Sequence, residues 1–109
     1  MAERVLEQCR LFNEGVRTGD WGGYLERFGD NATLRIEGDP GSPYVGKAAI
    51  AAAYVAQPPD DTLDVTSVTS DGDEDVARVA WSAGGGGTLR LRWSAGRISE
   101  LTAEFDPPA

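Results

Sequence analysis

Histidine is absent from this chain of 109 residues, and cysteine occurs once, as Cys9. A single cysteine cannot form an internal disulfide. Without histidine there is no Ser–His or Cys–His nucleophilic pair and no zinc site built on imidazole. Any proton transfer must therefore use carboxylates, tyrosines, lysine or ordered water. Cys9 has no evident cationic partner to lower its pKa, so we expect a buried, inert thiol.

Basic charge is also scarce, because 10 lysines and arginines face 18 aspartates and glutamates, a net charge of -8. A nucleic-acid partner needs a basic surface to neutralise phosphates, and anionic membrane surfaces need the same. No apolar run is long enough to cross a bilayer. The charged, amphipathic N-terminal segment lacks the apolar core of a signal peptide. We therefore expect a cytoplasmic protein that binds neither nucleic acid nor membrane.

Two segments that look like ion or phosphate sites lack essential residues. The acidic run 71–75 begins like a calcium loop, but its glycine is misplaced and its twelfth position is Ser82 instead of glutamate. We expect a solvated hairpin tip there. The glycines at 84–87 lack the Lys-Ser/Thr pair and the following helix of a phosphate loop, which predicts a flexible connection. No metal and no cofactor are expected.

The N-terminal half of the chain has the apolar spacing of helices. One amphipathic helix is predicted over residues 2–18, a short one over 21–28 and an alanine-rich one over about 47–56, before two prolines. The apolar residues of the first helix are Val5, Leu6, Cys9, Phe12 and Val16.

Alternating apolar and polar residues predict strands over 31–37 and, later, over about 63–68, 76–82, 88–93 and 97–105. Three helices followed mainly by a meander of strands indicate one α+β domain, residues 1–109, with helices on one face of a curved sheet. Four arginines should share the outer face of that sheet, which we interpret as a solvated or dimer-forming surface with cross-strand ion pairs. These arginines are Arg35, Arg78, Arg90 and Arg92.

Possible chemistry is concentrated where the first strand ends, at Glu37, Asp39 and Tyr44. A carboxylate held beside an apolar cavity gains proton affinity and can act as a base toward an acidic C–H or a water. The tyrosine hydroxyl could donate to a developing oxyanion. In the alternative interpretation, Glu37 continues the polar face of its strand and Asp39 forms an Asx-type turn before Pro40.

Several segments resemble the nuclear transport factor 2-like (NTF2-like) superfamily, especially its SnoaL-like and ketosteroid-isomerase-like branch. They are residues 18–21 (TGDW), 24–28 (YLERF), 31–34 (NATL), 43–50 (PYVGKAAI) and 96–98 (GRI). The resemblance implies a cone of three N-terminal helices packed on a strongly curved, mostly antiparallel sheet that encloses an apolar pocket. It also implies a homodimer, and relatives include isomerases, polyketide cyclases and epoxide hydrolases.

The catalytic residues of the isomerase do not carry over to this chain. Its helix tyrosine falls on Phe12, its second oxyanion donor on Leu89, and its base on Ile36 or, with one loop residue placed earlier, on Glu37. Ketosteroid isomerisation by the family mechanism is therefore not expected.

Two hypotheses follow, and they leave open whether the chain is an enzyme. In the first, a small apolar molecule binds in the pocket and carboxylate general-base chemistry acts on it, as in a cofactor-independent isomerase, cyclase or hydrolase-like enzyme. In the second, the chain is a non-catalytic ligand-binding or dimeric assembly module. The residues expected to line the pocket are Phe12, Val16, Leu34, Ile36, Tyr54, Leu89, Leu91, Trp93 and Leu101.

Overall fold

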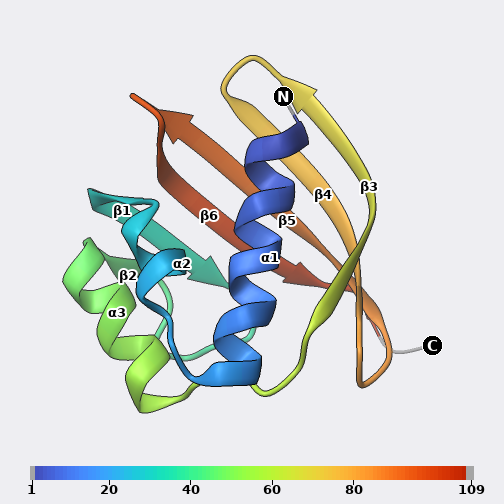
Figure 1. Ribbon diagram of the computed structural model, residues 1–109, viewed down its shortest axis with the longest axis horizontal. Helices are drawn as coiled ribbons and strands as arrows, with labels where there is room; N and C mark the ends of the chain where they lie inside the picture. The colour runs from blue at the N-terminus through green and yellow to red at the C-terminus, as the bar shows by residue number, and fades with distance from the viewer. Residues whose placement is uncertain (1, 108–109) are drawn as a thin grey trace.

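Three helices pack against a curved, mixed six-stranded sheet in the computed structural model, which describes residues 2–107 (Figure 1). This confirms the predicted α+β class. The sheet order is β2-β1-β6-β5-β4-β3. The elements are α1 (Ala2–Thr18), α2 (Gly22–Glu26), β1 (Phe28–Ile36), β2 (Tyr44–Val45), α3 (Lys47–Ala56), β3 (Leu63–Asp71), β4 (Glu74–Trp81), β5 (Gly86–Ser94) and β6 (Arg97–Phe105).

Strand β1 joins the sheet through a parallel pairing with β6, in which Leu34 lies opposite Leu101. The other strand pairs are antiparallel. Helix α1 packs on β3 and β4, and α3 packs on β1 and β2. The two helices therefore cover different parts of the sheet, and Figure 1 shows α1 lying across the middle of it.

The boundaries differ from the predictions around the first strand. The second helix ends at Glu26, and Phe28 already belongs to β1, where it is fully buried opposite Ile98. The predicted helix over residues 21–28 was therefore too long at its end, because apolar residues at 24, 25 and 28 fit a helix as well as a strand start. The two-residue strand β2 is too short to leave a periodic pattern.

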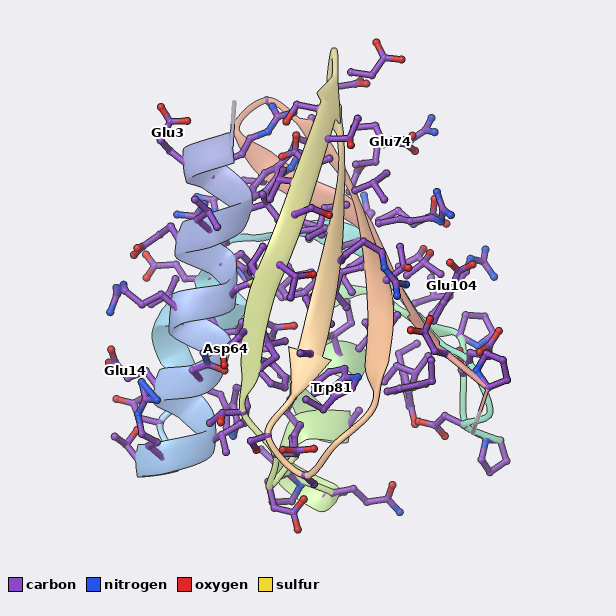
Figure 2. All side chains as sticks on the ribbon, turned by 90° about the vertical axis from the view of Figure 1, so that its right-hand side faces the viewer. Glu3, Glu14, Asp64, Glu74, Trp81 and Glu104 are labelled. Atoms are coloured by element: carbon purple, nitrogen blue, oxygen red, sulfur yellow. The ribbon has the colours of Figure 1, made fainter. Side chains whose placement is uncertain are left out.

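The outer face of the sheet carries the cross-strand ion pairs that the alternating arginines predicted. Figure 2 shows Glu74 and Glu104 on the side of the sheet away from α1. The pairs are Arg35–Glu100, Arg78–Asp106, Arg90–Glu104 and Arg92–Glu74.

Asp75 corrects the prediction of a solvated hairpin tip at 71–75, because its side chain is 0% exposed. Its Oδ2 accepts a hydrogen bond of 2.6 Å from Arg4 Nε on α1 and one of 3.0 Å from the Trp93 indole on β5. Burial alone would raise the pKa of Asp75, but the hydrogen bonds, chiefly that from Arg4, hold its pKa below the ordinary value. Only the neighbours of Asp75 in this run are solvated.

A second anchor holds the other half of α1. The Asn13 side chain donates to the backbone oxygen of Leu63 at 2.8 Å and accepts from its backbone nitrogen at 2.9 Å. Both polar atoms of the amide are thereby used by the first residue of β3. Helix α1 is thus fixed to β4 near one end and to β3 further along.

Replacing Asp75 with asparagine should lower the free energy of unfolding by about 2–3 kcal/mol, because Arg4 loses its anionic partner at a buried position. Urea unfolding measures this loss. Asp73→Asn, at an exposed position in the same turn, is the matched control and should change stability by less than about 0.5 kcal/mol.

The Asp75 effect should also depend on pH. A lowered pKa in the folded state adds stability above the unfolded pKa, and this stability is lost as the pH falls through the folded value. The advantage of the wild type over Asp75→Asn should therefore shrink below about pH 4, near the ordinary aspartate pKa of 3.8. A difference that is constant from pH 7 to about pH 2 would contradict the charge-based explanation.

Candidate functional site

A cavity of about 430 Å³ lies between the helices and the concave face of the sheet. Seven of the nine residues expected to line the pocket lie on its wall. They are Phe12, Leu34, Ile36, Tyr54, Leu89, Leu91 and Leu101. The side chains of β1, β5 and β6 alternate, so the four leucines and Ile36 face the helices while the paired arginines face away.

Val16 and Trp93 are not among the lining residues. Val16 is half-buried against the core without reaching the cavity. Trp93 is buried two residues beyond Leu91, where its indole donates to Asp75 and the Arg4 guanidinium carbon lies 5.3 Å from its ring centroid. The tryptophan therefore belongs to the anchor of α1.

The mouth of the cavity carries Asp39 and Tyr44, both half-buried. The Tyr44 hydroxyl donates to Asp39 Oδ2 at 2.8 Å, and the backbone nitrogen of Gly41 donates to Asp39 Oδ1 at 2.8 Å. The hydrogen bond to Asp39 raises the pKa of Tyr44. Asp39 therefore uses one carboxylate oxygen for the Asx-type turn and the other for the contact with Tyr44 at the cavity.

Gly41 allows this contact because it has no side chain. A Cβ atom at this position would lie 2.6 Å from the Tyr44 hydroxyl oxygen, closer than real Cβ atoms come to such a neighbour. The observed position of the Tyr44 hydroxyl beside Asp39 therefore depends on the small size of Gly41.

Glu37, the third predicted catalytic residue, is exposed and does not line the cavity. Its Oε1 accepts a hydrogen bond of 3.2 Å from the backbone nitrogen of Phe105. It follows Ile36, which faces the cavity, so the alternation along the strand directs Glu37 the other way. The structure brings Asp39 and Tyr44 together and leaves Glu37 outside.

The buried part of the cavity contains three polar side chains, of which Tyr54 was predicted and Gln8 and Tyr24 were missed. The hydroxyls of Tyr24 and Tyr54 lie 2.8 Å apart, and Gln8 Nε2 donates to the backbone oxygen of Tyr24 at 3.1 Å. All three side chains line the cavity. Gln8 stands three residues after Val5 and four before Phe12, so its helical position indicated an inward face even though its polar side chain did not.

Both of these tyrosines stay neutral at physiological pH. Burial, with a contribution from Tyr54, raises the pKa of Tyr24 well above its ordinary value, and burial raises the pKa of Tyr54 to about 12. Cys9, also on the cavity wall, is buried as predicted, and burial raises its pKa to about 11. At neutral pH the tyrosines can therefore donate hydrogen bonds, and the thiol is protonated.

Two further observations concern residues 2–107. No helix in this part of the chain has the length and apolarity needed to cross a membrane. Among the same residues, no three acidic or cysteine side chains are grouped so that they could hold a metal ion.

Helices over a curved mixed sheet, with a cavity between the two layers, define the NTF2-like class of α+β proteins. Within this class, the chain belongs to the SnoaL-like domain family, whose model matches residues 9–101. The prediction that residues 1–109 form one domain stays a prediction.

Similar solved structures support the same class. An NTF2-like protein of unknown function from Burkholderia xenovorans LB400 has a TM-score of 0.75 and 16% identity, covering 99% of this chain and 87% of that chain. A Kribbella flavida DSM 17836 protein, provisionally named a ketosteroid isomerase, has a TM-score of 0.73 and 18% identity, covering 98% and 84%. A Sinorhizobium meliloti protein, provisionally named a polyketide cyclase, has a TM-score of 0.72 and 20% identity, covering 90% and 94%.

At these identities the likeness shows the fold alone, because one fold can carry many functions. No curated protein matches the sequence significantly. Any function must therefore be argued from the residues of the cavity.

Proposed function

We propose that this protein binds a small, neutral, mainly apolar molecule in the cavity between the helices and the sheet. The observation that carries the proposal is the cavity itself, because about 430 Å³ falls within the range of natural ligand pockets and its wall is built largely from leucine and aromatic side chains. A few polar groups at the mouth and in the buried part would orient the bound molecule.

Charge supports a neutral ligand. Asp39, Asp60 and Asp61 line the cavity, and the whole chain carries a net charge of -8. The potential of these carboxylates would repel an anion approaching the cavity. A carboxylate or phosphate ligand is therefore disfavoured.

Proton transfer is the second candidate function, and the Asp39–Tyr44 contact favours it. Asp39 could take a proton from an acidic C–H of the bound molecule, while the Tyr44 hydroxyl donates to the oxygen on which negative charge develops. Glu37 is not part of this proposal because it lies outside the cavity. The ketosteroid mechanism is not proposed, since Phe12 and Leu89 are apolar at the positions where it needs donors.

We also propose a homodimer formed through the outer face of the sheet. The four ion pairs on this face combine four arginines with four acids, so these eight side chains carry no net charge, in a chain of net charge -8. A second copy could approach this face without the net repulsion that the rest of the acidic surface would cause.

Filling the cavity should prevent ligand binding. Ala103 lines the cavity and Thr102, next to it on β6, pairs with Arg90 and Arg35 on the outer face. Ala103→Phe should weaken the binding of naphthalene at least about tenfold, and the matched control Thr102→Phe should leave it within about twofold. Naphthalene fluorescence measures binding, and circular dichroism establishes that both variants fold. Undiminished binding to folded Ala103→Phe would contradict occupancy of this cavity.

Catalysis can be tested with 2-tetralone, a neutral bicyclic ketone with acidic α-hydrogens. In D₂O, Asp39 would remove an α-proton, the enolate oxygen would accept a hydrogen bond from Tyr44, and a deuteron would return to the carbon. Asp39→Asn should slow the protein-dependent exchange about 10²- to 10⁴-fold, and Glu37→Gln should leave it within about twofold. Proton NMR follows the exchange. Wild-type protein that adds nothing to the rate in buffer would refute the proton-transfer proposal and leave binding alone.

The dimer proposal is tested by sedimentation of the 11.6 kDa chain over a range of concentrations. Thr102→Arg puts an unpaired charge in the middle of the neutral face and should weaken association at least about tenfold. Glu3→Arg is the control, because Glu3 is exposed and projects from α1 on the side away from the sheet (Figure 2). A wild-type chain that stays monomeric at millimolar concentration would exclude the proposed dimer.

A further inference from the structure

Gln8 presents an unused hydrogen-bond acceptor in the buried part of the cavity. Its side chain lines the cavity, the residue is 2% exposed, and Nε2 donates to the backbone oxygen of Tyr24. Among residues 2–107, Oε1 has no hydrogen-bond partner. The orientation of the amide is fixed, because the reversed amide would place Oε1 against the Tyr24 carbonyl oxygen. A buried acceptor without a partner is unfavourable, which indicates that another molecule supplies the donor.

The tyrosine pair presents an unused donor on the same wall. Tyr24 and Tyr54 each carry one hydroxyl hydrogen, and the hydrogen bond between the two oxygens uses one of them. The second hydrogen remains free to donate, whichever tyrosine carries it. Gln8 donates to the backbone oxygen of Tyr24, and its side chain also lies within reach of the Tyr24 hydroxyl, so the free acceptor and the tyrosine pair are neighbours on the cavity wall.

We propose that Gln8, Tyr24 and Tyr54 form a subsite for a hydroxyl group, so that the ligand is an apolar alcohol or phenol. The ligand hydroxyl donates to Gln8 Oε1, and its oxygen accepts the free hydrogen of the tyrosine pair. This inference rests on the proposed function and specifies its ligand class. An ether or ketone lacks the donor that Gln8 requires, and a carboxylate would face the Gln8 oxygen with like charge.

Other buried polar groups of the protein give weaker support for a ligand site. Trp81 also lines the cavity and its Nε1 is buried without a partner, but this nitrogen lies beside the sheet backbone, 3.2 Å from where a Cβ atom on Gly87 would be, and no second unused polar group accompanies it. Cys9 has no polar partner that points to a ligand. Gln8 differs because its free acceptor oxygen lies near the tyrosine pair, which has an unused donor hydrogen.

The test compares three probes that share the naphthalene ring: 2-naphthol, 2-methoxynaphthalene and naphthalene. Wild-type protein should bind 2-naphthol at least about fivefold more tightly than 2-methoxynaphthalene, because only the naphthol can donate. In Gln8→Leu this ratio should fall to about one while the affinity for naphthalene is retained. Gln57→Leu is the matched control, since Gln57 also lines the cavity but is exposed, and it should keep the wild-type ratio.

The outcomes separate this inference from the proposed function. Binding of naphthalene without a preference for the naphthol in the wild type, or a preference that survives in Gln8→Leu, overturns the hydroxyl subsite and leaves the binding proposal standing. Failure of all three probes to bind overturns both. The wild-type comparison needs no variant, so the inference can be refuted even if Gln8→Leu does not fold.

Discussion

The buried carboxylate of Asp75 is the constraint on which the position of α1 depends. A charge without solvent contact needs a compensating partner, and here Arg4 reaches it from a helix 71 residues away in sequence. Asn13 adds the second anchor at Leu63. Because Gln8, Cys9 and Phe12 lie between these anchors, both the helical wall of the cavity and its buried polar group follow from them.

The fold could be predicted where neighbouring residues alone determine an element. The 3.6-residue spacing on α1 and the alternation along β5 and β6 both reflect one buried face, and such patterns are visible in the sequence. The parallel pairing of β1 with β6 joins distant segments and leaves no local pattern. The burial of Asp75 was missed for the same reason, since its neighbours at 71–75 are acidic and only its distant partner Arg4 accounts for it.

The residues of the candidate site could be predicted where they lie on strands, because side chains there alternate between the two faces of the sheet. Alternation identified Leu34 and Ile36 as inward-facing and placed Glu37 on the opposite face, but it does not extend into the loop and so could not tell where Asp39 would turn. The loop turns Asp39 toward the cavity. Gln8 was overlooked because glutamine side chains are mostly solvent-facing, and only its hydrogen bond to the Tyr24 backbone shows how it is accommodated on the buried face of α1.

Because Gly41 has no side chain, the residue at this position in a related chain should indicate whether the contact at the cavity mouth is kept. A larger residue there would collide with the Tyr44 hydroxyl unless the loop moved. A related chain that carries a larger residue at this position must therefore shift the loop or the tyrosine ring, which would alter the tyrosine–carboxylate contact, so we expect glycine and tyrosine to vary together. Sorting relatives by this pair of positions would separate those that keep a polar group at the cavity mouth from those that have replaced it.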